Sequence, residues 1–464
     1  MSMGDDDRAY HHQMSVIVTA ANANLPGHGK GPLVSVSSEL LTKESHLMYD
    51  FERYVARNPS RFNQKVLDNL RIHHTYTRSS LDTLVNEFLA EITPACANRD
   101  APSMLPSKMG SLPNDSLTGS VLSIDIGGST LRGSMVDLEK MTVTDSVQHL
   151  IPDTVKNYSG SDFFDWIVER IMPLVKDCTA TIIPIGLSWS FPIFQPHISS
   201  GLIQTMGKGY GVADEIINQD LKELFETHFA SHGKTVEVGA ILNDSVASLV
   251  AANYISNAPL CLILGTGINV SALIPKDQLK KTEQDQDKYI VNCEASLFGQ
   301  CVSKTCWDLE LDQALERPGF QPLESLSSGR YLGEICRLIL RDLSKTGFLS
   351  RPDVGPYELT TAEVADLETA DSGELDYVQD IILATSDRSA ALASAFITAI
   401  YKLTGSDCES PSIAYDGTMV QKYPNFRPRM QQRLREQGLN VTFVAVEEGT
   451  VYGSAIACAS QLSQ

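Results

Sequence analysis

Short apolar runs that end in glycine or asparagine turns recur along the chain after residue 119, and amphipathic stretches alternate with them. Runs of about four to eight apolar residues are typical of buried strands, whereas apolar residues spaced three and four apart indicate helices. The predicted strands are Val121–Ile126, Thr181–Leu187, Val236–Leu242 and Leu260–Leu264. The predicted helices are Phe163–Val175, Asp244–Tyr254, Tyr377–Leu403 and Gly453–Gln464. This alternation predicts an α/β fold whose strand ends carry polar loops, where open α/β sheets bind ligands.

The first 119 residues have a different texture. Residues 1–40 mix Gly, Pro, Ser and His without a sustained period, which predicts a disordered tail. From residue 41 to about residue 95, apolar residues recur at helical spacing, as in Leu81, Leu84, Val85 and Phe88. A connector rich in Pro and Gly runs from Pro102 to Thr118. We therefore expect residues 41–119 to form a helical opening and a connector.

Charge and length narrow the function classes. The chain has 464 residues and a net charge of −20, from 37 Lys and Arg against 57 Asp and Glu. At roughly 100 to 200 residues per domain, two or three lobes are expected. The excess of acidic residues argues against direct binding to nucleic acid, whose phosphates demand cations. No apolar run approaches the ~20 residues that span a bilayer, and the start of the chain lacks a secretory pattern. We expect a cytoplasmic protein without a membrane partner.

The nine cysteines are Cys96, Cys178, Cys261, Cys293, Cys301, Cys306, Cys336, Cys408 and Cys458. They form no C-x-x-C pair, and no His lies nearby at zinc-ligand spacing. An odd number without such spacing is typical of reduced thiols in a cytosolic chain. We interpret them as small hydrophobic residues of the core.

The first candidate site is the segment Asp125-Ile126-Gly127-Gly128-Ser129-Thr130-Leu131-Arg132, which follows a predicted strand. Successive glycines let the backbone approach a phosphate, and the two hydroxyls add donors. A carboxylate at the strand tip, Asp125, can hold Mg²⁺ through water. The alternative is a plain hairpin turn.

A second glycine turn, Gly265-Thr266-Gly267-Ile268-Asn269, follows another apolar strand. It could cradle the other end of a nucleoside triphosphate. Two such strand-turn units together suggest that both face one nucleotide. This pair indicates nucleotide binding more strongly than either turn alone.

Asn243 and Asp244 come directly after the strand that ends at Leu242, where a helix begins. Because Asn, Asp and Ser are preferred N-cap residues, helix capping is one interpretation. The other is that Asp244 is a general base that takes a proton from an acceptor hydroxyl.

Other polar residues on loops are candidates for substrate contacts. Ser190 follows a predicted strand, and Lys208 lies between Gly207 and Gly209, where its charge could stabilise a transferring phosphoryl group. Asn292, Glu294, Gln321 and Glu324 supply the amides and carboxylates that polyol recognition needs. Each of these residues could equally be an ordinary solvated side chain.

The order of these segments resembles the hexokinase family of ATP-dependent sugar kinases over about residues 45–464. Met104-Leu105-Pro106-Ser107 is similar to the family's entry loop, and the two glycine turns to its two phosphate motifs. Asn243-Asp244 is similar to the motif with the catalytic Asp, and Asn292, Glu294, Phe298 and Gly299 to its sugar-contacting segment. Asp416-Gly417-Thr418 is similar to the adenosine motif, and Glu448-Gly449-Thr450 to the start of the closing helix.

The resemblance implies a role for each matching residue, with ATP and Mg²⁺ as cofactors. Asp244 and Lys208 would be catalytic, and Asp125 would hold Mg²⁺ through water. The implied substrate-binding residues are Ser190, Lys208, Asn243, Asp244, Asn269, Glu294, Gln321 and Glu324. The implied ATP-binding residues are Asp125, Gly127, Gly128, Ser129, Thr130, Arg132, Gly265, Thr266, Gly267, Asp416, Gly417 and Thr418.

The resemblance also implies the two-lobed actin-like fold of the sugar kinases, with a cleft that closes on sugar and excludes water. The small lobe would comprise residues 120–242 and 449–464. Residues 243–448 would form the large lobe, on which the helical opening and connector, residues 41–119, would mainly pack.

Local departures from the family pattern bear on the substrate. Gly207 stands where the family has Thr, Thr130 where it has Asn, and Ala295-Ser296 where it has Trp-Gly after the sugar-binding glutamate. Replacing an indole by a methyl group predicts extra space near carbon 2 of the sugar, which could admit an acetamido group. The chain in this respect resembles the fungal hexokinase-derived N-acetylglucosamine kinases. The alternative is that neighbouring helices fill the volume and glucose remains the substrate.

Three functions therefore stay open at this stage. The first is phosphorylation of the 6-hydroxyl of N-acetylglucosamine, and the second is a glycolytic hexokinase acting on glucose, fructose or mannose. The third is a regulatory sugar sensor that has kept the fold but little catalysis. Asp244 and Lys208 argue against the third, whereas the departures near the sugar argue for it. An Asp244→Ala protein would separate catalysis from regulation.

Overall fold

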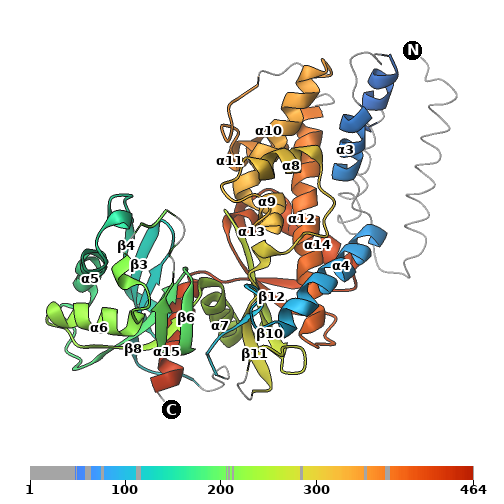
Figure 1. Ribbon diagram of the computed structural model, residues 1–464. Helices are drawn as coiled ribbons and strands as arrows, with labels where there is room; N and C mark the ends of the chain where they lie inside the picture. The colour runs from blue at the N-terminus through green and yellow to red at the C-terminus, as the bar shows by residue number, and fades with distance from the viewer. Residues whose placement is uncertain are drawn as a thin grey trace.

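The computed structural model describes residues 47–48, 50–57, 64–74, 78–110, 116–204, 206, 209–211, 214–282, 286–349, 353–370 and 377–462. The tail expected at residues 1–40 and the candidates Gly207 and Lys208 lie outside these residues. The described chain forms two lobes, each built on one large mixed sheet (Figure 1).

The first lobe contains a five-stranded sheet in the order β4-β3-β2-β5-β8. Strands β2, β3 and β4 pair antiparallel, whereas β5 pairs parallel with both β2 and β8. The strands are β2 (Ser120–Ile126), β3 (Thr130–Asp137), β4 (Thr142–Leu150), β5 (Ile183–Trp189) and β8 (Val236–Leu242). A hairpin, β6 (Ile193–His197) with β7 (Ser200–Ile203), follows β5.

Helices cover both faces of this sheet. One face packs against α5 (Gly160–Val175) and α6 (Leu221–Ser231), because Leu122 and Ile124 of β2 join the same core cluster as Phe163. The other face packs against α15 (Gly449–Leu462), where Ser123 and Ser454 share a hydrogen bond of 2.8 Å between their hydroxyls. The alternation of side chains along β2 therefore serves two buried faces.

The second lobe contains a six-stranded sheet in the order β1-β11-β10-β9-β12-β13. Strands β1, β11, β10 and β9 pair antiparallel, and β9, β12 and β13 pair parallel. The strands are β1 (Leu105–Pro106), β9 (Leu260–Leu264), β10 (Ile268–Pro275), β11 (Lys288–Asn292), β12 (Ser412–Asp416) and β13 (Thr442–Ala445). On one face lies α7 (Asp244–Ser256).

The opposite face carries a large group of helices, drawn above the sheet in Figure 1. They are α3 (Gln64–His74), α4 (Arg78–Ala97), α8 (Cys306–Gln313), α9 (Pro322–Ser327), α10 (Gly329–Lys345), α11 (Thr361–Thr369), α12 (Tyr377–Leu403), α13 (Thr418–Lys422) and α14 (Phe426–Glu436). The long helix α12 is buried along most of its length. Buried ion pairs link its surroundings, such as Arg388 with Asp308 at 2.8 Å and Arg429 with Glu368 at 2.6 Å.

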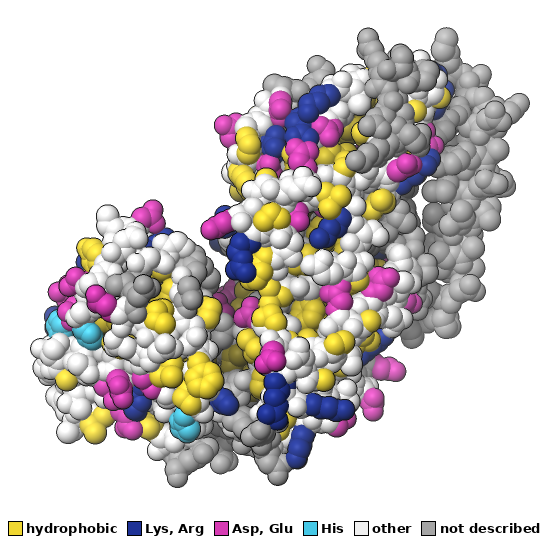
Figure 2. Space-filling model, in the orientation of Figure 1, with side chains coloured by type: hydrophobic (Ala, Val, Ile, Leu, Met, Phe, Trp, Pro, Cys, Tyr) yellow, Lys and Arg dark blue, Asp and Glu magenta, His cyan; other side chains and the backbone are white. Residues whose placement is uncertain are grey.

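The two lobes meet where α7 and α15 cross. Leu249 and Val250 of α7 and Val451 and Ala455 of α15 belong to one shared hydrophobic cluster. At the crossing, a Cβ on Gly453 would overlap the carbonyl oxygen of Ala247, so only glycine permits this approach. The space-filling view shows the surface hollowed between the lobes (Figure 2).

The sequence predicted several elements with their exact bounds, namely β8, β9 and α12. Other bounds were wrong by a few residues. Strand β5 begins at Ile183 and continues to Trp189, and α15 begins at Gly449, four residues before the expected start. The backbone amides of Val451 and Tyr452 bond to the carbonyl of Glu448, so the first helical turn forms over polar residues that carry no apolar period.

All nine cysteines are free thiols. Five of them are buried, three are partly buried and Cys408 is exposed, so the core interpretation holds for most but not for Cys408. Within the described ranges, none of the helices combines the length and the apolar character needed to cross a membrane.

Candidate functional site

Both glycine segments are hairpin turns at corresponding places in the two sheets. The first joins β2 to β3, with the amide of Gly127 bonded to the carbonyl of Thr130 at 3.0 Å. The second joins β9 to β10, with the amide of Gly265 bonded to the carbonyl of Gly267 at 3.0 Å. The hairpin alternative raised for the first segment is thus correct, and the second segment is a hairpin turn as well. A phosphate role stays open for both turns because both lie at strand tips.

Asp125 lies at the end of β2, partly buried beneath the first turn. Its carboxylate accepts a hydrogen bond of 3.1 Å from the hydroxyl of Thr450, the second residue of α15. Burial raises the pKa of Asp125, and the nearby carboxylate of Asp244 raises this pKa further. A carboxylate whose ionised form is disfavoured by burial and by a neighbouring carboxylate is suited to receive a cation.

Ser190 and Asp244 lie side by side at the ends of two neighbouring strands. The hydroxyl of Ser190 donates to Asp244 Oδ2 at 2.9 Å, and the amide of Ser190 bonds to the carbonyl of Ile126 at 3.2 Å. Because β2, β5 and β8 run parallel, their carboxyl ends bring Asp125, Ser190 and Asp244 to one edge of the sheet.

Asn243 and Asp244 both contact the first turn of α7, and the amide of Ser245 donates to Asp244 Oδ1 at 2.7 Å. Asn243 is the N-cap of α7, and its side chain accepts from the amide of Ser245 at 3.0 Å. Asp244 is the first residue of α7 and keeps Oδ2 toward Ser190. Capping of α7 therefore leaves Asp244 Oδ2 at the sheet edge beside Ser190.

A network of amides and a carboxylate connects the second sheet to this edge. Asn292 Oδ1 accepts from Asn269 Nδ2 at 3.0 Å and from the hydroxyl of Ser245 at 3.3 Å. Asn292 Nδ2 donates to Glu294 Oε1 at 2.8 Å. Since Ser245 follows Asp244 directly, the network joins the candidate base to Asn269 and Glu294.

Gln321 and Glu324 come from the short helix α9 and its N-terminal flank. Gln321 Nε2 donates to the hydroxyl of Ser296 at 3.2 Å, and Glu324 Oε2 accepts from the backbone amide of Ile268 at 3.2 Å. Gln321 therefore contacts the segment that follows Glu294, and Glu324 contacts the second glycine turn.

The expected space beside Glu294 does not lie at Ala295. Glu294 adopts a left-handed conformation with φ of 50°, which redirects the chain after it. Ala295 is fully buried in the main core of the second lobe, and its amide donates to Asn269 Oδ1 at 3.1 Å. Its methyl group packs against the core rather than facing an opening, so this part of the substrate prediction was wrong.

The second glycine turn also contacts Asp416-Gly417-Thr418, the segment that resembles the family's adenosine motif. The amides of Gly329 and Arg330, at the start of α10, bond to the carbonyls of Gly265 and Thr266. A Cβ on Gly265 would lie 3.3 Å from the amide nitrogen of Thr418 and 3.5 Å from Gly417. The turn therefore sits between α10 and α13.

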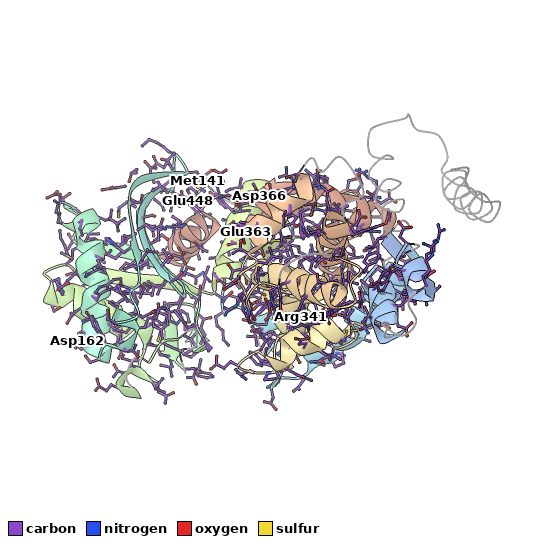
Figure 3. All side chains as sticks on the ribbon, turned by 90° about the horizontal axis from the view of Figure 1, so that it is seen from above. Met141, Asp162, Arg341, Glu363, Asp366 and Glu448 are labelled. Carbon is purple, nitrogen blue, oxygen red and sulfur yellow. The ribbon has the colours of Figure 1, made fainter. Side chains whose placement is uncertain are left out.

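A pocket of about 660 Å³ lies between the lobes at this end. It brings together Arg132 from β3, Asp416 from β12 and Thr450 from α15. Seen from above, Glu448 lies beside α15 (Figure 3). Glu448 lines this pocket together with Glu447, and the cations of Arg132 and Lys422 line it too, so the pocket offers both cationic side chains for phosphate and carboxylates for a cation that accompanies it.

The candidate residues thus fall into two connected groups. The first group gathers Asp125, Ser190, Asn243 and Asp244, which network contacts extend to Asn269 and Glu294. The second gathers Gly265, Thr266, Gly267, Glu324, Gly417 and Thr418. Gly128 and Ser129 occupy the first turn, and Lys208 lies outside the described residues.

Sequence reasoning assigned no site role to Thr450 or Ser296. Thr450 contacts Asp125 although the two are separated by 325 residues. The Gly-Thr pair at residues 449–450 repeats the Gly-Thr pair at residues 417–418, which was the available signal. Ser296 had been noted as a departure, but its bond to Gln321 follows only from the fold.

The residues present fit a Mg²⁺ ion held largely by water and phosphate. The described chain holds no cluster of three or more His, Cys, Asp or Glu side chains arranged to bind a metal. Mg²⁺ retains several waters and commonly takes one or two carboxylates together with substrate phosphates. The carboxylate of Asp125, at the tip of β2, meets that requirement.

Comparison with known proteins places these features in a family. Descriptions of the hexokinase family match residues 66–254 and 260–460, which together span most of the chain. Among curated proteins, N-acetylglucosamine kinase 1 of Candida albicans is 26% identical over 448 residues, covering 82% of this chain and 90% of that protein. Hexokinase-2 of Saccharomyces cerevisiae is also 26% identical, covering 85% of this chain and 91% of that protein.

Solved structures agree on the fold. A hexokinase from Schistosoma mansoni complexed with glucose superimposes with a TM-score of 0.72 at 22% identity, over 86% of this chain and 98% of that chain. Another hexokinase crystal structure gives a TM-score of 0.74 at 22% identity with the same coverage. The two-lobed α/β architecture predicted from the sequence is confirmed.

Proposed function

Because the chain belongs to the hexokinase family and is a sugar kinase, we propose that it transfers the γ-phosphoryl group of ATP to the 6-hydroxyl of a hexose. The single observation that carries this proposal is the Ser190–Asp244 contact at 2.9 Å, at the sheet edge where Asp125 also lies, one residue before the end of β2. One carboxylate can take a proton there while a second one faces a cation.

In this proposal Asp244 is the general base. It accepts the proton of the 6-hydroxyl as the hydroxyl oxygen bonds to phosphorus and the bond to the ADP oxygen breaks. Ser190 holds Asp244 Oδ2 by its hydroxyl, which directs the carboxylate. Mg²⁺, held through water by Asp125, would neutralise charge on the phosphates. Lys208 would stabilise the same charge, a role that rests on the family resemblance.

The two glycine turns are proposed to hold the two ends of ATP. The first turn, Gly127 to Thr130 with Arg132, faces the phosphates, and the second, Gly265 to Gly267, lies against Gly417 and Thr418 on the nucleoside side. Asn243, Asn269, Glu294, Gln321 and Glu324 are proposed to bind the hexose. Their bonded network supports this assignment, since sugar hydroxyls need fixed donors and acceptors.

N-acetylglucosamine is the proposed substrate, in amino-sugar catabolism. Because Ala295 does not open the expected space, the support for this substrate comes from the contact between Ser296 and Gln321. The NH₂ group of Gln321 donates to the hydroxyl of Ser296. Gln321 Oε1 is then oriented to accept a hydrogen bond from the N–H of an acetamido group. Similarity to the Candida albicans N-acetylglucosamine kinase agrees with this choice.

Glucose is the second candidate, because a hexokinase of Candida albicans is 27% identical to this chain over 449 residues, against 26% over 448 residues for the N-acetylglucosamine kinase. A 2-hydroxyl can donate to Gln321 Oε1 as an N–H can. The choice between the two sugars therefore requires that turnover on each of them be measured and compared.

The experiment is ADP release by the purified protein with Mg-ATP and, separately, N-acetylglucosamine, glucose, fructose and mannose. We expect turnover on N-acetylglucosamine above that on glucose, and its loss in Asp244→Ala. A preference for glucose would remove the substrate proposal while leaving the kinase. No turnover on any of the sugars would contradict the proposed activity and favour the regulatory alternative.

Two further expectations from the sequence are kept as proposals. The small lobe is proposed to comprise residues 120–242 and 449–464 and the large lobe residues 243–448, supported by the packing of α15 on β2, β5 and β8. Pairing of β1 with β11 supports placing residues 41–119 on the large lobe. A cytoplasmic location is proposed from the nine free thiols.

A further inference from the structure

Glu324 contacts the nucleotide turn although the family resemblance assigns it to the sugar. Its Oε2 accepts from the amide of Ile268 at 3.2 Å, directly after Gly267. The bond between a carboxylate and a backbone amide is charge-assisted, and such bonds are about twice as strong as neutral ones. Glu324 therefore helps to hold the second turn in place.

The helix that carries Glu324 is held from the opposite side. The amide of Leu323 bonds to the carbonyl of Phe298 at 2.8 Å, and Gln321 donates to Ser296 at 3.2 Å. Both partners lie just after Glu294, in the segment proposed to contact the hexose. The backbone of α9 thus follows the hexose end of the site, while the Glu324 carboxylate reaches the nucleotide end.

The absence of a side chain at Gly267 is what admits this carboxylate. A Cβ built on Gly267 would lie 2.5 Å from Glu324 Oε2 and 3.3 Å from Glu324 Cδ. The conflict is with the end of a flexible side chain, so an alanine at this position would displace the carboxylate while the backbone stays.

Gly265, two residues earlier in the same turn, provides a contrast. The three atoms nearest to its Cβ would belong to Thr418 and Gly417, at 3.3 to 3.5 Å, and none of them to Glu324. Two glycines of one turn therefore face different partners, one toward the proposed nucleoside side and one toward α9.

We propose that Glu324 is a shared positioning carboxylate that couples the hexose end of the site to the second nucleotide turn through Ile268 and Gly267. This inference rests on the proposed kinase function. A carboxylate can accept several hydrogen bonds, so Glu324 can hold Ile268 and a hexose hydroxyl together. A change at Gly267 then alters hexose affinity even when no nucleotide is bound.

The test measures hexose binding by calorimetry in nucleotide-free protein, with N-acetylglucosamine and glucose as probes. Gly267→Ala is expected to weaken hexose binding about ten-fold, which corresponds to losing one hydrogen bond to a charged group. The matched variant Gly265→Ala is expected to leave hexose affinity within about two-fold of wild type and to weaken binding of a non-hydrolysable Mg-ATP analogue. Equal hexose affinities in the two variants would overturn the coupling.

A second variant tests the same contact from the nucleotide side. Glu324→Asp keeps the charge but shortens the side chain by one methylene group, so it loses reach to Ile268. Without hexose, its affinity for the Mg-ATP analogue should fall several-fold, whereas a residue that contacts sugar alone would leave this affinity unchanged. An unchanged affinity would overturn the proposal.

The two proposals fail in different ways. If wild-type protein binds no hexose and releases no ADP with any sugar, the proposed function fails. If wild type binds and phosphorylates hexose but Gly267→Ala binds it as tightly, only the shared role of Glu324 fails.

Discussion

The two sheets of this protein share one strand order but differ in the chemistry of their edges. Strands β4-β3-β2-β5-β8 in the first lobe correspond to β11-β10-β9-β12-β13 in the second, each with a glycine turn in its first hairpin. Each series ends in a helix that packs against the other lobe's sheet, α7 on the second and α15 on the first. The scaffold is therefore close to a duplicated unit with exchanged final helices.

The carboxylates are not duplicated. Asp125 precedes the first turn, but Ile263 occupies the corresponding place before the second. Asp244 begins the helix that follows the first sheet, whereas the second half contributes the amides of Asn269 and Asn292 and, away from these two carboxylates, Glu294, Glu324 and Asp416. The first half therefore supplies the two carboxylates proposed to act at the transferred phosphoryl group, and the second half supplies those proposed for the hexose and the nucleoside.

The halves also differ in what lies between equivalent strands. Between β4 and β5 the first lobe has one long helix, α5, whereas α8 to α12 lie between β11 and β12 in the second. Those helices carry Gln321 and Glu324, so the hexose contacts proposed for them depend on an addition to one half only. The duplicated strand order accounts for the two glycine turns. The added helices α8 to α12 account for the residues proposed to bind the hexose.

The largest expected effect comes from the carboxylate without a counterpart. Asp244→Asn should lower kcat by about 10²- to 10⁴-fold, because the amide cannot take the proton of the hydroxyl. ADP release at saturating hexose and Mg-ATP measures it. The exposed Asp177→Asn is the control and should keep wild-type turnover. A loss below about five-fold in Asp244→Asn would contradict its role as base.

The second largest effect is expected where α15 packs against α7, and it should be seen in stability. Gly453→Ala places a methyl group against the carbonyl of Ala247 and should cost about 1–3 kcal/mol of unfolding free energy, as overpacking does. Urea denaturation measures it. Gly110→Ala is the matched control, because a Cβ there meets nothing within 4 Å. Equal stabilities of the two variants would mean that the helices separate without cost.

Asp125 should show its effect through pH. Its pKa is raised from 3.8 by burial, so the folded state favours the protonated form. Stability from this group is present below pH 3.8 and is lost as pH rises through the raised pKa. At neutral pH without metal or nucleotide, Asp125→Asn should therefore unfold at a higher temperature than wild type while losing kinase activity.

Thermal unfolding across pH 4 to 8 checks this expectation, and the gap between the two proteins should narrow toward the acidic end. A mutant that is less stable than wild type at neutral pH would show that Thr450 and the other partners stabilise the ionised form more than burial destabilises it.

The smallest effect is expected at the anchor of the first turn. The hydroxyl of Tyr210 donates to the carbonyl of Gly127 at 3.1 Å, and burial raises the pKa of Tyr210 to about 12, so it stays a donor. Tyr210→Phe should cost about 0.5–1.5 kcal/mol of stability and raise the KM for ATP a few-fold with little change in kcat. An unchanged KM would separate this anchor from nucleotide binding.

How far the sequence predicted the site can be judged from individual residues. Asn243, Asp244 and the two glycine turns were predicted because each follows an apolar strand directly, and strand ends gather at one sheet edge. The contact between Thr450 and Asp125 was not, because nothing local relates residues so distant in the chain. The expectation about Ala295 was wrong because the direction of a side chain depends on the backbone turn at Glu294.

The sequence by itself determined the α/β class, the bounds of strands such as β8 and β9, and the residues that stand at strand ends. These follow from apolar runs and from glycine and asparagine turns, which act over a few residues. Only the tertiary structure decided that Glu324 reaches Ile268, that Ser296 holds Gln321 and that Ala295 is enclosed in the core. Such contacts depend on how α9 and the neighbouring helices pack on the second sheet, and packing is a property of the whole chain.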